Sequence, residues 1–406
     1  MPKQQPKKKK KQVKQKPPAR WLLGLAFLFV YPYFRLRYRM TIDKSGMADL
    51  KKGEPSVILA PHLSNNDHLL VGMAVWPHLP TFVLSEHFMR NPFLRWLFNH
   101  FVHPISKKMF CADPHTIMAI LRAKQAGHNV IIFPEGRLPA CGHTVPVTPG
   151  TAELVKKLGV NVYVVTQSGA YKTFPKWATY RRRGKIHITT AKLFDGASLK
   201  TMPLDEVRAR IDAAILHVDE EVMPDVRYTC RDMTAGLDGI LRRCPNCTKI
   251  GTLHTQRGHI TCACGLDATL DDNYRLHNAP FDRIYQWYDW QLSQVDPMTE
   301  AMETEVIVGA VNAKGNVDRA AGQGRLRMDR DWITFAGEIF GEGVVLRTPT
   351  KQVGGLPVTV AEHFDVYFTN EMYHFFPTED PRSVMDWVIW MERYWQLQET
   401  AETNAQ

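Results

Sequence analysis

The hydrophobic residues between positions 38 and 226 fall in short runs separated by longer amphipathic segments. The runs are SVILA (56–60), TFVLS (81–85), NVIIF (129–133), NVYVV (161–165) and KIHITT (185–190). One segment between them, PHTIMAILRAKQAG (114–127), has apolar residues at helical spacing. Short β-rich runs that alternate with helices are typical of an α/β sheet. The pattern therefore predicts an α/β domain over residues 38–226, closed by a helix over 203–222.

The pattern changes after residue 303, where short alternating runs are separated by Gly and Asn turns. These runs are TEVIVGAVNA (304–313), GQGRLRMDRDWITFAG (322–337), GVVLRTPT (343–350), VTVAEHFDVYFTN (358–370) and MYHFFPT (372–378). A last amphipathic segment, SVMDWVIWMERYWQ, predicts a helix with Ser383 as its N-cap and Asp386 three positions later. Antiparallel strands closed by one C-terminal helix resemble a PH-like domain. With the aromatic helix expected over 281–295, this predicts a mainly antiparallel β domain over residues 279–400.

The positive charge of the chain is concentrated at its N-terminus. The formal net charge is +10, and residues 1–20 contain eight lysines, one arginine and no acidic residue, so the remaining residues carry only about +1. A block of like charges with Gln and Pro predicts a disordered tail. Such a tail binds anionic surfaces of any kind, so by itself it is compatible with RNA and with anionic lipid.

The uncharged segment WLLGLAFLFVYPYF (21–34) favours lipid over nucleic acid as the partner of this tail. Fourteen helical residues span roughly 21 Å, which is less than the roughly 30 Å hydrocarbon core of a bilayer. We therefore expect a membrane-interface helix over residues 21–37 on the cytoplasmic face, peripheral or half-inserted and anchored by Trp21, Tyr31 and Tyr33. A helix buried against the domain and a cleaved signal peptide are the alternatives.

Four of the seven cysteines lie between residues 244 and 264, in CPNCTKIGTLHTQRGHITCACG. The spacing Cys244-x2-Cys247, then Cys262-x-Cys264, predicts paired thiolates at the tips of two facing hairpins. The second pair is one residue shorter than the usual knuckle, so His259 could replace one thiolate. We expect a structural zinc in a ribbon-like segment over residues 227–278, with reduced, unliganded cysteines as the alternative.

Two polar constellations follow predicted strands of the α/β domain. The first, PHLSNNDH (61–68), contains His62 and Asp67 at the start of an expected helix. Ser64 and Asp67 form a capping-box-like pair, so helix capping alone could explain this carboxylate. If the chain folds back at the turn, Asp67 can reach the His62 ring, fix its tautomer and leave the other nitrogen as a base.

The second constellation is FPEGR, residues 133–137, where a strand runs into a tight turn. The carboxyl end of a strand in an open α/β sheet is a common ligand site. Together, HLSNND and FPEGR, in this order and spacing, resemble the motifs of the PlsC-like glycerolipid acyltransferase family over about residues 38–200. The resemblance also covers RNPFLRWLFNHFVHPISKK (90–108) and VTPGTAELVKKLGVNVYVV (147–165).

The resemblance implies an O-acyltransferase with no catalytic cofactor. His62 would activate a glycerol hydroxyl, Asp67 would orient His62, and the acyl group would come from acyl-ACP (acyl carrier protein) or acyl-CoA. It places acceptor binding at Glu135, Gly136, Arg137, Lys107 and Ser64. The expected acceptor is a lysophospholipid, foremost 1-acyl-sn-glycerol-3-phosphate, which would yield phosphatidic acid in phospholipid biosynthesis.

The sequence departs from the family pattern at several positions, which leaves the acceptor headgroup open. Pro61 stands where asparagine is usual, the turn reads Glu-Gly-Arg without the usual threonine, and Lys107 stands where the family has an arginine. Lysine is a point charge and arginine a planar fork, so lysophosphatidylethanolamine or another lysolipid is an alternative acceptor. A membrane lipid-binding scaffold is the non-enzymatic alternative, and no nucleic-acid partner is expected. His68, His87 and His103 match no motif and are expected to be structural, and Cys111 and Cys141 to be plain thiols.

Overall fold

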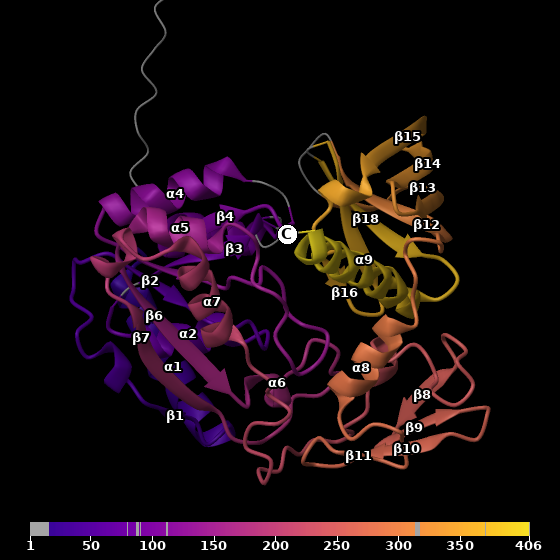
Figure 1. Ribbon diagram of the computed structural model, residues 1–406, viewed down its shortest axis with the longest axis horizontal. Coiled ribbons are helices and arrows are strands. Elements are labelled where there is room, and N and C mark those ends of the chain that lie inside the picture. The colour runs from indigo at the N-terminus through magenta and orange to yellow at the C-terminus, as the bar shows by residue number, and fades with distance from the viewer. Residues whose placement is uncertain are drawn as a thin grey trace, which may run out of the picture.

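The computed structural model describes residues 16–78, 80–86, 89, 91–110, 113–312, 317–369 and 371–405, with side chains to 401. Most of the Lys-rich tail, His87 and Cys111 lie outside these residues. Figure 1 shows an α/β part, a small ribbon of strands, and a C-terminal sheet with one long helix.

The α/β part is built on a seven-stranded sheet in the order β1-β7-β6-β2-β5-β3-β4. All neighbours are parallel except β6 and β7, which are antiparallel. The strands are β1 (Thr41–Ile42), β2 (Ser56–Leu59), β3 (Pro80–Ser85), β4 (Ile105–Lys107), β5 (Asn129–Ile132), β6 (Asn161–Ser168) and β7 (His187–Phe194). The five predicted strands are confirmed; β1 and β4 were not predicted.

Helices cover both faces of this sheet. They are α1 (Arg20–Arg37), α2 (Asp67–Val75), α3 (Pro92–Leu97), α4 (Pro114–Gln125), α5 (Thr151–Leu158), α6 (Ala170–Thr173) and α7 (Leu204–Ile215), with a π-helical turn η3 (Phe98–Val102) and 3-10 turns η1 (Ser45–Met47) and η4 (Ser198–Lys200). Val57 and Leu59 of β2 point into a core shared with α4, α5 and α7. Ile58 and Ala60 point to the opposite face, against α2. This alternation is what a central strand buried on both faces requires.

The helix expected over 203–222 is shorter than predicted, because α7 ends at Ile215. The acidic residues that follow are used in tertiary contacts. Asp219 is fully buried and accepts hydrogen bonds from the backbone N–H groups of Gly169 and Lys172 at 2.6 and 3.2 Å. These bonds take the segment 216–222 away from the helix axis, which a periodicity argument could not reveal.

Along the chain, the α/β part is followed by a four-stranded antiparallel sheet, in the order β11-β10-β9-β8, and a helix. The C-terminal part comes after this helix. The elements between the two parts are η5 (Leu237–Gly239), β8 (Leu253–Gln256), β9 (His259–Cys262), β10 (Asp267–Leu270), β11 (Leu276–His277) and α8 (Ile284–Ser293). Trp287 and Tyr288 of α8, which corresponds to the aromatic helix expected over 281–295, are buried.

The C-terminal part is a seven-stranded antiparallel sheet, in the order β15-β14-β13-β12-β18-β17-β16, with helix α9 packed on it. The elements are β12 (Met302–Val311), β13 (Val317–Met328), β14 (Trp332–Ile339), β15 (Glu342–Pro349), η6 (Thr350–Gln352), β16 (Val358–Thr359), β17 (His363–Phe368), β18 (Glu371–Pro377), η7 (Pro381–Ser383) and α9 (Val384–Ala405). This confirms an antiparallel β region that ends in a helix; its likeness to a PH domain stays a prediction. The expected helix begins at Val384, directly after Ser383, and Ser383 also ends the 3-10 turn η7, which is capped by the Asp380 side chain; the N-cap role of Ser383 stays a prediction.

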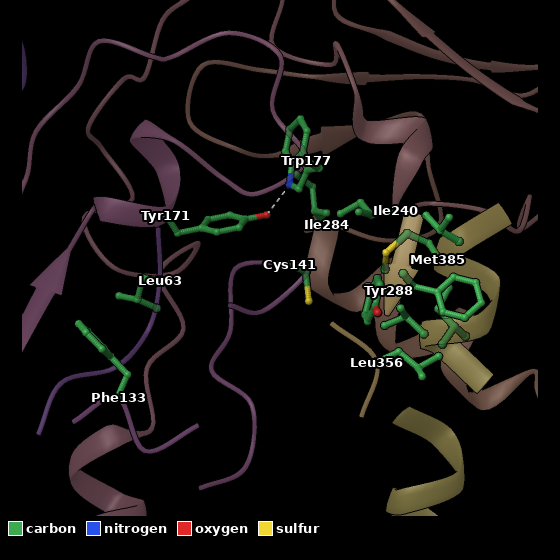
Figure 2. Packing of buried hydrophobic residues seen from close by; sticks show 14 of the residues in the cluster. Leu63, Phe133, Cys141, Tyr171, Trp177, Ile240, Ile284, Tyr288, Leu356 and Met385 are labelled. Carbon is green, nitrogen blue, oxygen red and sulfur yellow. Dashed lines mark hydrogen bonds between the residues drawn. The ribbon is translucent and has the colours of Figure 1, made fainter. Parts of the chain in front are cut away.

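The parts share a continuous apolar core. Figure 2 shows it running from Leu63 and Phe133, past Tyr171 and Trp177, to Tyr288 and on to Met385 and Leu356. The Trp177 indole N–H donates to the Tyr171 hydroxyl at 2.9 Å within this core. Residues of α8 and α9 can therefore contact the α/β part directly.

Candidate active site

The turn between β2 and α2 folds back so that Asp67 reaches His62. Asp67 is fully buried, and its Oδ2 lies 2.7 Å from His62 Nδ1. The same oxygen accepts the backbone N–H groups of Leu63 and Ser64 at 2.5 and 2.8 Å, and Oδ1 accepts the Ser64 hydroxyl at 3.0 Å. Because an ionised carboxylate can only accept, Nδ1 of His62 must carry its proton and Nε2 is left as the basic nitrogen. Asp67 thus caps the turn and orients His62 at once.

Two further groups hold His62 in place. The Phe133 ring stacks on the imidazole, with ring centroids 4.6 Å apart and planes at 27°. The buried Gln167 amide donates to the Pro61 carbonyl at 2.7 Å, which fixes the backbone just before the histidine. Neither contact was predicted. The expectations for the motif at 133–137 concerned the residues after Phe133, and Gln167 lies on β6, more than a hundred positions away in the sequence.

His68, on the first turn of α2, lies close to His62. The two ring centroids are 5.7 Å apart, and the His68 ring also contacts Phe133 edge-on at 4.8 Å. Burial, followed by the nearby charge of His62, lowers the pKa of His68 from 6.5 to about 4. His68 is therefore neutral at physiological pH and leaves His62 as the basic imidazole beside Asp67.

The turn after β5 contains the Pro-Glu-Gly-Arg motif, and its glutamate faces inward. Glu135 is 2% exposed; its Oε2 accepts the backbone N–H of His62 at 2.5 Å and its Oε1 that of Val145 at 3.3 Å. Burial raises the pKa of Glu135 well above its ordinary value. Glu135 joins the two motifs through the backbone of His62, and Ser64, also fully buried, bonds within the turn. Glu135 and Ser64 were expected to bind the acceptor, but their burial fits a role in positioning His62 and Asp67.

Gly136 and Lys107 lie together on the outer side of this turn. Gly136 adopts φ +71°, a backbone conformation that favours glycine, and its N–H donates to the Phe133 carbonyl at 3.1 Å. A Cβ at Gly136 would lie 3.8 Å from Lys107 Nζ, so the Lys107 ammonium sits against the turn. Burial lowers the pKa of Lys107. The strands β2, β5 and β4 therefore bring His62, the motif turn and Lys107 to one edge of the sheet.

Arg137 meets a residue that the sequence did not point to. Its Nη1 lies 2.5 Å from Oε1 of Glu392, on α9, in a pair whose side chains are 19% and 11% exposed. The other oxygen of Glu392 accepts the Tyr288 hydroxyl of α8 at 2.9 Å. Lys176 is close by: burial, then the charge of Arg137, lowers its pKa to about 8, against the opposing effects of Glu392 and Asp365. Residues of the C-terminal part thus contribute to the charge of the expected acceptor site.

The same C-terminal part contacts two other loops at this edge of the sheet. The Tyr367 hydroxyl of β17 donates to Glu86, just after β3, at 2.9 Å. A Cβ at Gly355 would lie 2.6 Å from the Phe110 ring, which follows β4. The loops after β3, β4 and β5 are therefore all covered by residues from beyond position 350.

The four clustered cysteines converge as their spacing predicted. Their sulfur atoms lie within 4.8 Å of one another, with Cys244 and Cys264 3.6 Å apart and Cys247 and Cys262 3.8 Å apart. Four thiolates around a tetrahedral zinc, each at about 2.3 Å, are separated by about 3.8 Å, so the residues fit this metal. His259 instead bonds Asp267 through Nδ1 at 2.7 Å, outside the sulfur cluster. The geometry thus favours Cys264 over His259 as the fourth ligand.

Comparison with known proteins supports the interpretation of the α/β part. Residues 41–168 match the Acyltransferase family model. The chain therefore contains an acyltransferase-family domain, and both His62–Asp67 and the turn at 133–137 lie inside it. Among solved structures, the chain is similar to the 1-acyl-sn-glycerophosphate acyltransferase PlsC from Thermotoga maritima, with 17% identity and a TM-score of 0.38. The alignment covers 48% of this chain and 77% of that one.

Proposed function

We propose that the protein is an O-acyltransferase that moves a fatty acyl group from acyl-ACP or acyl-CoA to the free hydroxyl of a lysophospholipid. The observation that carries this proposal is the buried Asp67, which leaves Nε2 of His62 as a base, inside a domain that matches the Acyltransferase family model. The nearby Lys107 and Arg137 provide positive charge for an anionic headgroup.

The reaction needs one base and no acyl-enzyme. Nε2 of His62 takes the proton of the acceptor hydroxyl while its oxygen attacks the thioester carbonyl. The resulting imidazolium is stabilised by Asp67, and its proton goes to the departing thiolate as the carbon–sulfur bond breaks. The Phe133 stack and the Glu135 bond to the His62 backbone keep the imidazole oriented through both steps.

Our preferred acceptor is 1-acyl-sn-glycerol-3-phosphate, whose phosphate Arg137 can bind through its planar fork with Lys107 as a second cation. One observation supports testing a second acceptor, lysophosphatidylethanolamine. The Glu392 carboxylate beside Arg137 reduces the positive charge of the site and could face the ammonium of this zwitterion.

Two further proposals concern the rest of the molecule. The four cysteines would hold a structural zinc, which fixes the two knuckles against α8 without taking part in the chemistry. Helix α1 would lie on the cytoplasmic face of the membrane. Among the described helices, none combines the length and the apolar character needed to cross a bilayer, which fits an interfacial position.

The central test is product analysis by mass spectrometry, with a panel of lysolipids and both thioester donors. His62→Ala should abolish acyl transfer without lowering the melting temperature, whereas His115→Ala, an exposed histidine on α4, should keep the wild-type rate. Transfer by His62→Ala at the wild-type rate would refute the mechanism. A wild-type protein that binds lysolipids but forms no product with any donor would favour the scaffold alternative.

A further inference from the structure

A groove at the end of α1 is lined by four arginines. It has a volume of 480 Å³ and is formed by Arg37, Tyr180, Arg181, Arg183, Thr229, Cys230 and Arg231, with no acidic residue among them. Arg37 is the last residue of α1, and the others come from two segments that pair through Arg183 and Thr229. Four cations around one groove repel one another unless an anion lies between them.

Five exposed arginines elsewhere in the described structure are paired with carboxylates, unlike the arginines of this groove. Arg208, Arg227, Arg319, Arg325 and Arg327 each pair with a carboxylate. The groove arginines are instead held by aromatic rings and backbone carbonyls. Arg181 lies over the Phe174 ring at 4.7 Å, Arg231 over the Tyr180 ring at 5.9 Å, and Arg37 donates to the Arg181 carbonyl at 3.4 Å. Within the described residues, none of the four forms a salt bridge, so their charge remains available to a ligand.

The position of the groove indicates which anion it meets. Helix α1 exposes one apolar stripe along its whole length, which ends next to Arg37. The stripe contains Trp21, Leu25, Leu28, Phe29, Tyr33 and Leu36, the last 82% exposed. A helix with such a stripe lies flat in the membrane interface, its apolar face about 5–10 Å deep. Side chains at its end then lie at the level of the lipid phosphates.

A second helix extends this apolar surface at the opposite end of α1. Phe93 and Trp96 of α3 are 66% and 50% exposed. The Phe101 ring lies between Trp96 and Trp21, at centroid distances of 5.5 and 5.9 Å. The two helices therefore make one continuous surface, which favours a lipid layer over a small soluble ligand as the neighbour of the groove.

We propose that the groove binds the phosphate of an anionic phospholipid in the membrane on which α1 lies. The proposal rests on the interfacial position proposed for α1, but it adds a specific headgroup site distinct from the Lys-rich tail. Arginine suits such a site because its planar fork binds phosphate oxygens in pairs.

The test compares two triple variants of the full chain that have the same net charge. R181Q/R183Q/R231Q removes three groove arginines, and R208Q/R210Q/R325Q removes three exposed arginines that do not line the groove. Binding is measured by flotation with vesicles of phosphatidylcholine, alone or with 20 mol% phosphatidylglycerol. We expect the groove variant to lose at least tenfold in affinity for the anionic vesicles, the control variant less than about twofold, and both to bind neutral vesicles as the wild type does.

Four outcomes would overturn the proposal. Equal losses of affinity for anionic vesicles in both variants would show that net charge alone determines binding. No loss of affinity in either variant would show that the Lys-rich tail determines the preference for anionic lipid. A raised KM for acyl-CoA with unchanged vesicle binding would show that the donor's phosphates occupy the groove. Acyl transfer to a detergent-dispersed acceptor is measured in parallel. Transfer without vesicle binding by the wild type would refute the membrane proposals while leaving the enzymatic one intact.

Discussion

At the scale of single residues, Asp67 combines two roles that are usually separate. It accepts two backbone N–H groups of its own turn and also the Nδ1–H of His62. A capping aspartate would need only the first set of bonds. Since the same oxygen serves both, the shape of the turn and the tautomer of the base depend on one buried carboxylate.

Asp67→Asn should therefore reduce catalysis far more than stability. The amide oxygen can take the place of Oδ2 and keep the bonds of the turn and of the Nδ1–H of His62, but the neutral amide no longer stabilises the imidazolium that forms when His62 takes the proton. We expect kcat to fall by about 10⁴-fold with KM little changed. Ser64→Ala is the control, because it removes the bond to Oδ1 and the bond from the Asn66 N–H but leaves the bond between Oδ2 and His62, and it should lower kcat less than tenfold. A kcat for Asp67→Asn within tenfold of wild type would argue against His62 as the base.

His68 gives the domain a pH dependence of its own. Its pKa is about 4 in the folded protein, owing to burial and then to the charge of His62, against 6.5 in the unfolded chain. Between these values the unfolded state binds more protons, so the contribution of His68 to stability is complete above pH 6.5 and is lost as the pH falls towards 4. Between pH 7 and pH 5 the loss is about 2 kcal/mol.

Replacement of His68 by leucine should remove this part of the pH dependence, because leucine carries no proton and suits the contacts with Phe82 and Phe133. Urea unfolding gives the free energy of unfolding at pH 7 and at pH 5. The difference between these two values is compared between the wild type and His68→Leu. An identical difference in both proteins would mean that other groups, not His68, titrate in this range.

At the scale of elements, continuous apolar runs predicted the central strands well. The sequence did not predict the ends of elements that are set by tertiary contacts. The five central strands were predictable because each is a continuous buried run. The short β1 and β4 were not, since strands of two or three residues leave no periodic signal. The end of α7 depends on Asp219, which accepts hydrogen bonds from Gly169 and Lys172. These residues are distant from Asp219 in the sequence, so no local pattern indicates the contact.

The cysteine ribbon is the element whose local order should depend on a metal. Arg242, two residues before Cys244, is 4% exposed and pairs with Asp386 at the start of α9 and with Asp380 before it. The ribbon is therefore joined to the helix that carries Glu392. Loss of the knuckle geometry should loosen this buried pair, and breaking a buried pair costs about 3–5 kcal/mol.

Cys262→Ser should lower the bound zinc from one per chain to none and reduce the melting temperature. Cys230→Ser, outside the sulfur cluster, should do neither. Elemental analysis of the purified proteins and thermal unfolding followed by circular dichroism measure the two effects. A wild-type protein without zinc, and as stable as the Cys262→Ser variant, would mean that the four cysteines are plain thiols.

At the scale of the whole molecule, the site is assembled from segments far apart in the chain. His62, Asp67 and the Pro-Glu-Gly-Arg turn could be identified from sequence because each is a compact motif after a strand. Glu392 and Tyr288 could not, because each is one polar residue in an aromatic helix with no local pattern around it. Only the packing of α8 and α9 against the α/β part brings them to Arg137.

Glu392 should influence which headgroup the enzyme prefers. A unit charge acting over roughly 6 Å at an effective dielectric constant of about 20 contributes about 3 kcal/mol before screening. Glu392→Gln removes this charge but keeps the size and shape of the side chain. The site then becomes more favourable for the phosphate dianion of 1-acyl-sn-glycerol-3-phosphate and less favourable for the ammonium of lysophosphatidylethanolamine. We expect the ratio of kcat/KM for these two acceptors to shift at least tenfold towards the dianion.

The ratio is the useful measurement because any general loosening of Arg137 affects both acceptors alike and cancels. Tyr288→Phe is the matched control: it removes the hydroxyl that bonds Glu392 but keeps the carboxylate charge, so the ratio should change less than twofold even if both rates fall. A ratio that is unchanged in Glu392→Gln would place the headgroup beyond the reach of Glu392 and leave its pairing with Arg137 as a contact that only joins α9 to the α/β part. A shift confined to Glu392→Gln would make α9, the last helix of the chain, part of the acceptor site.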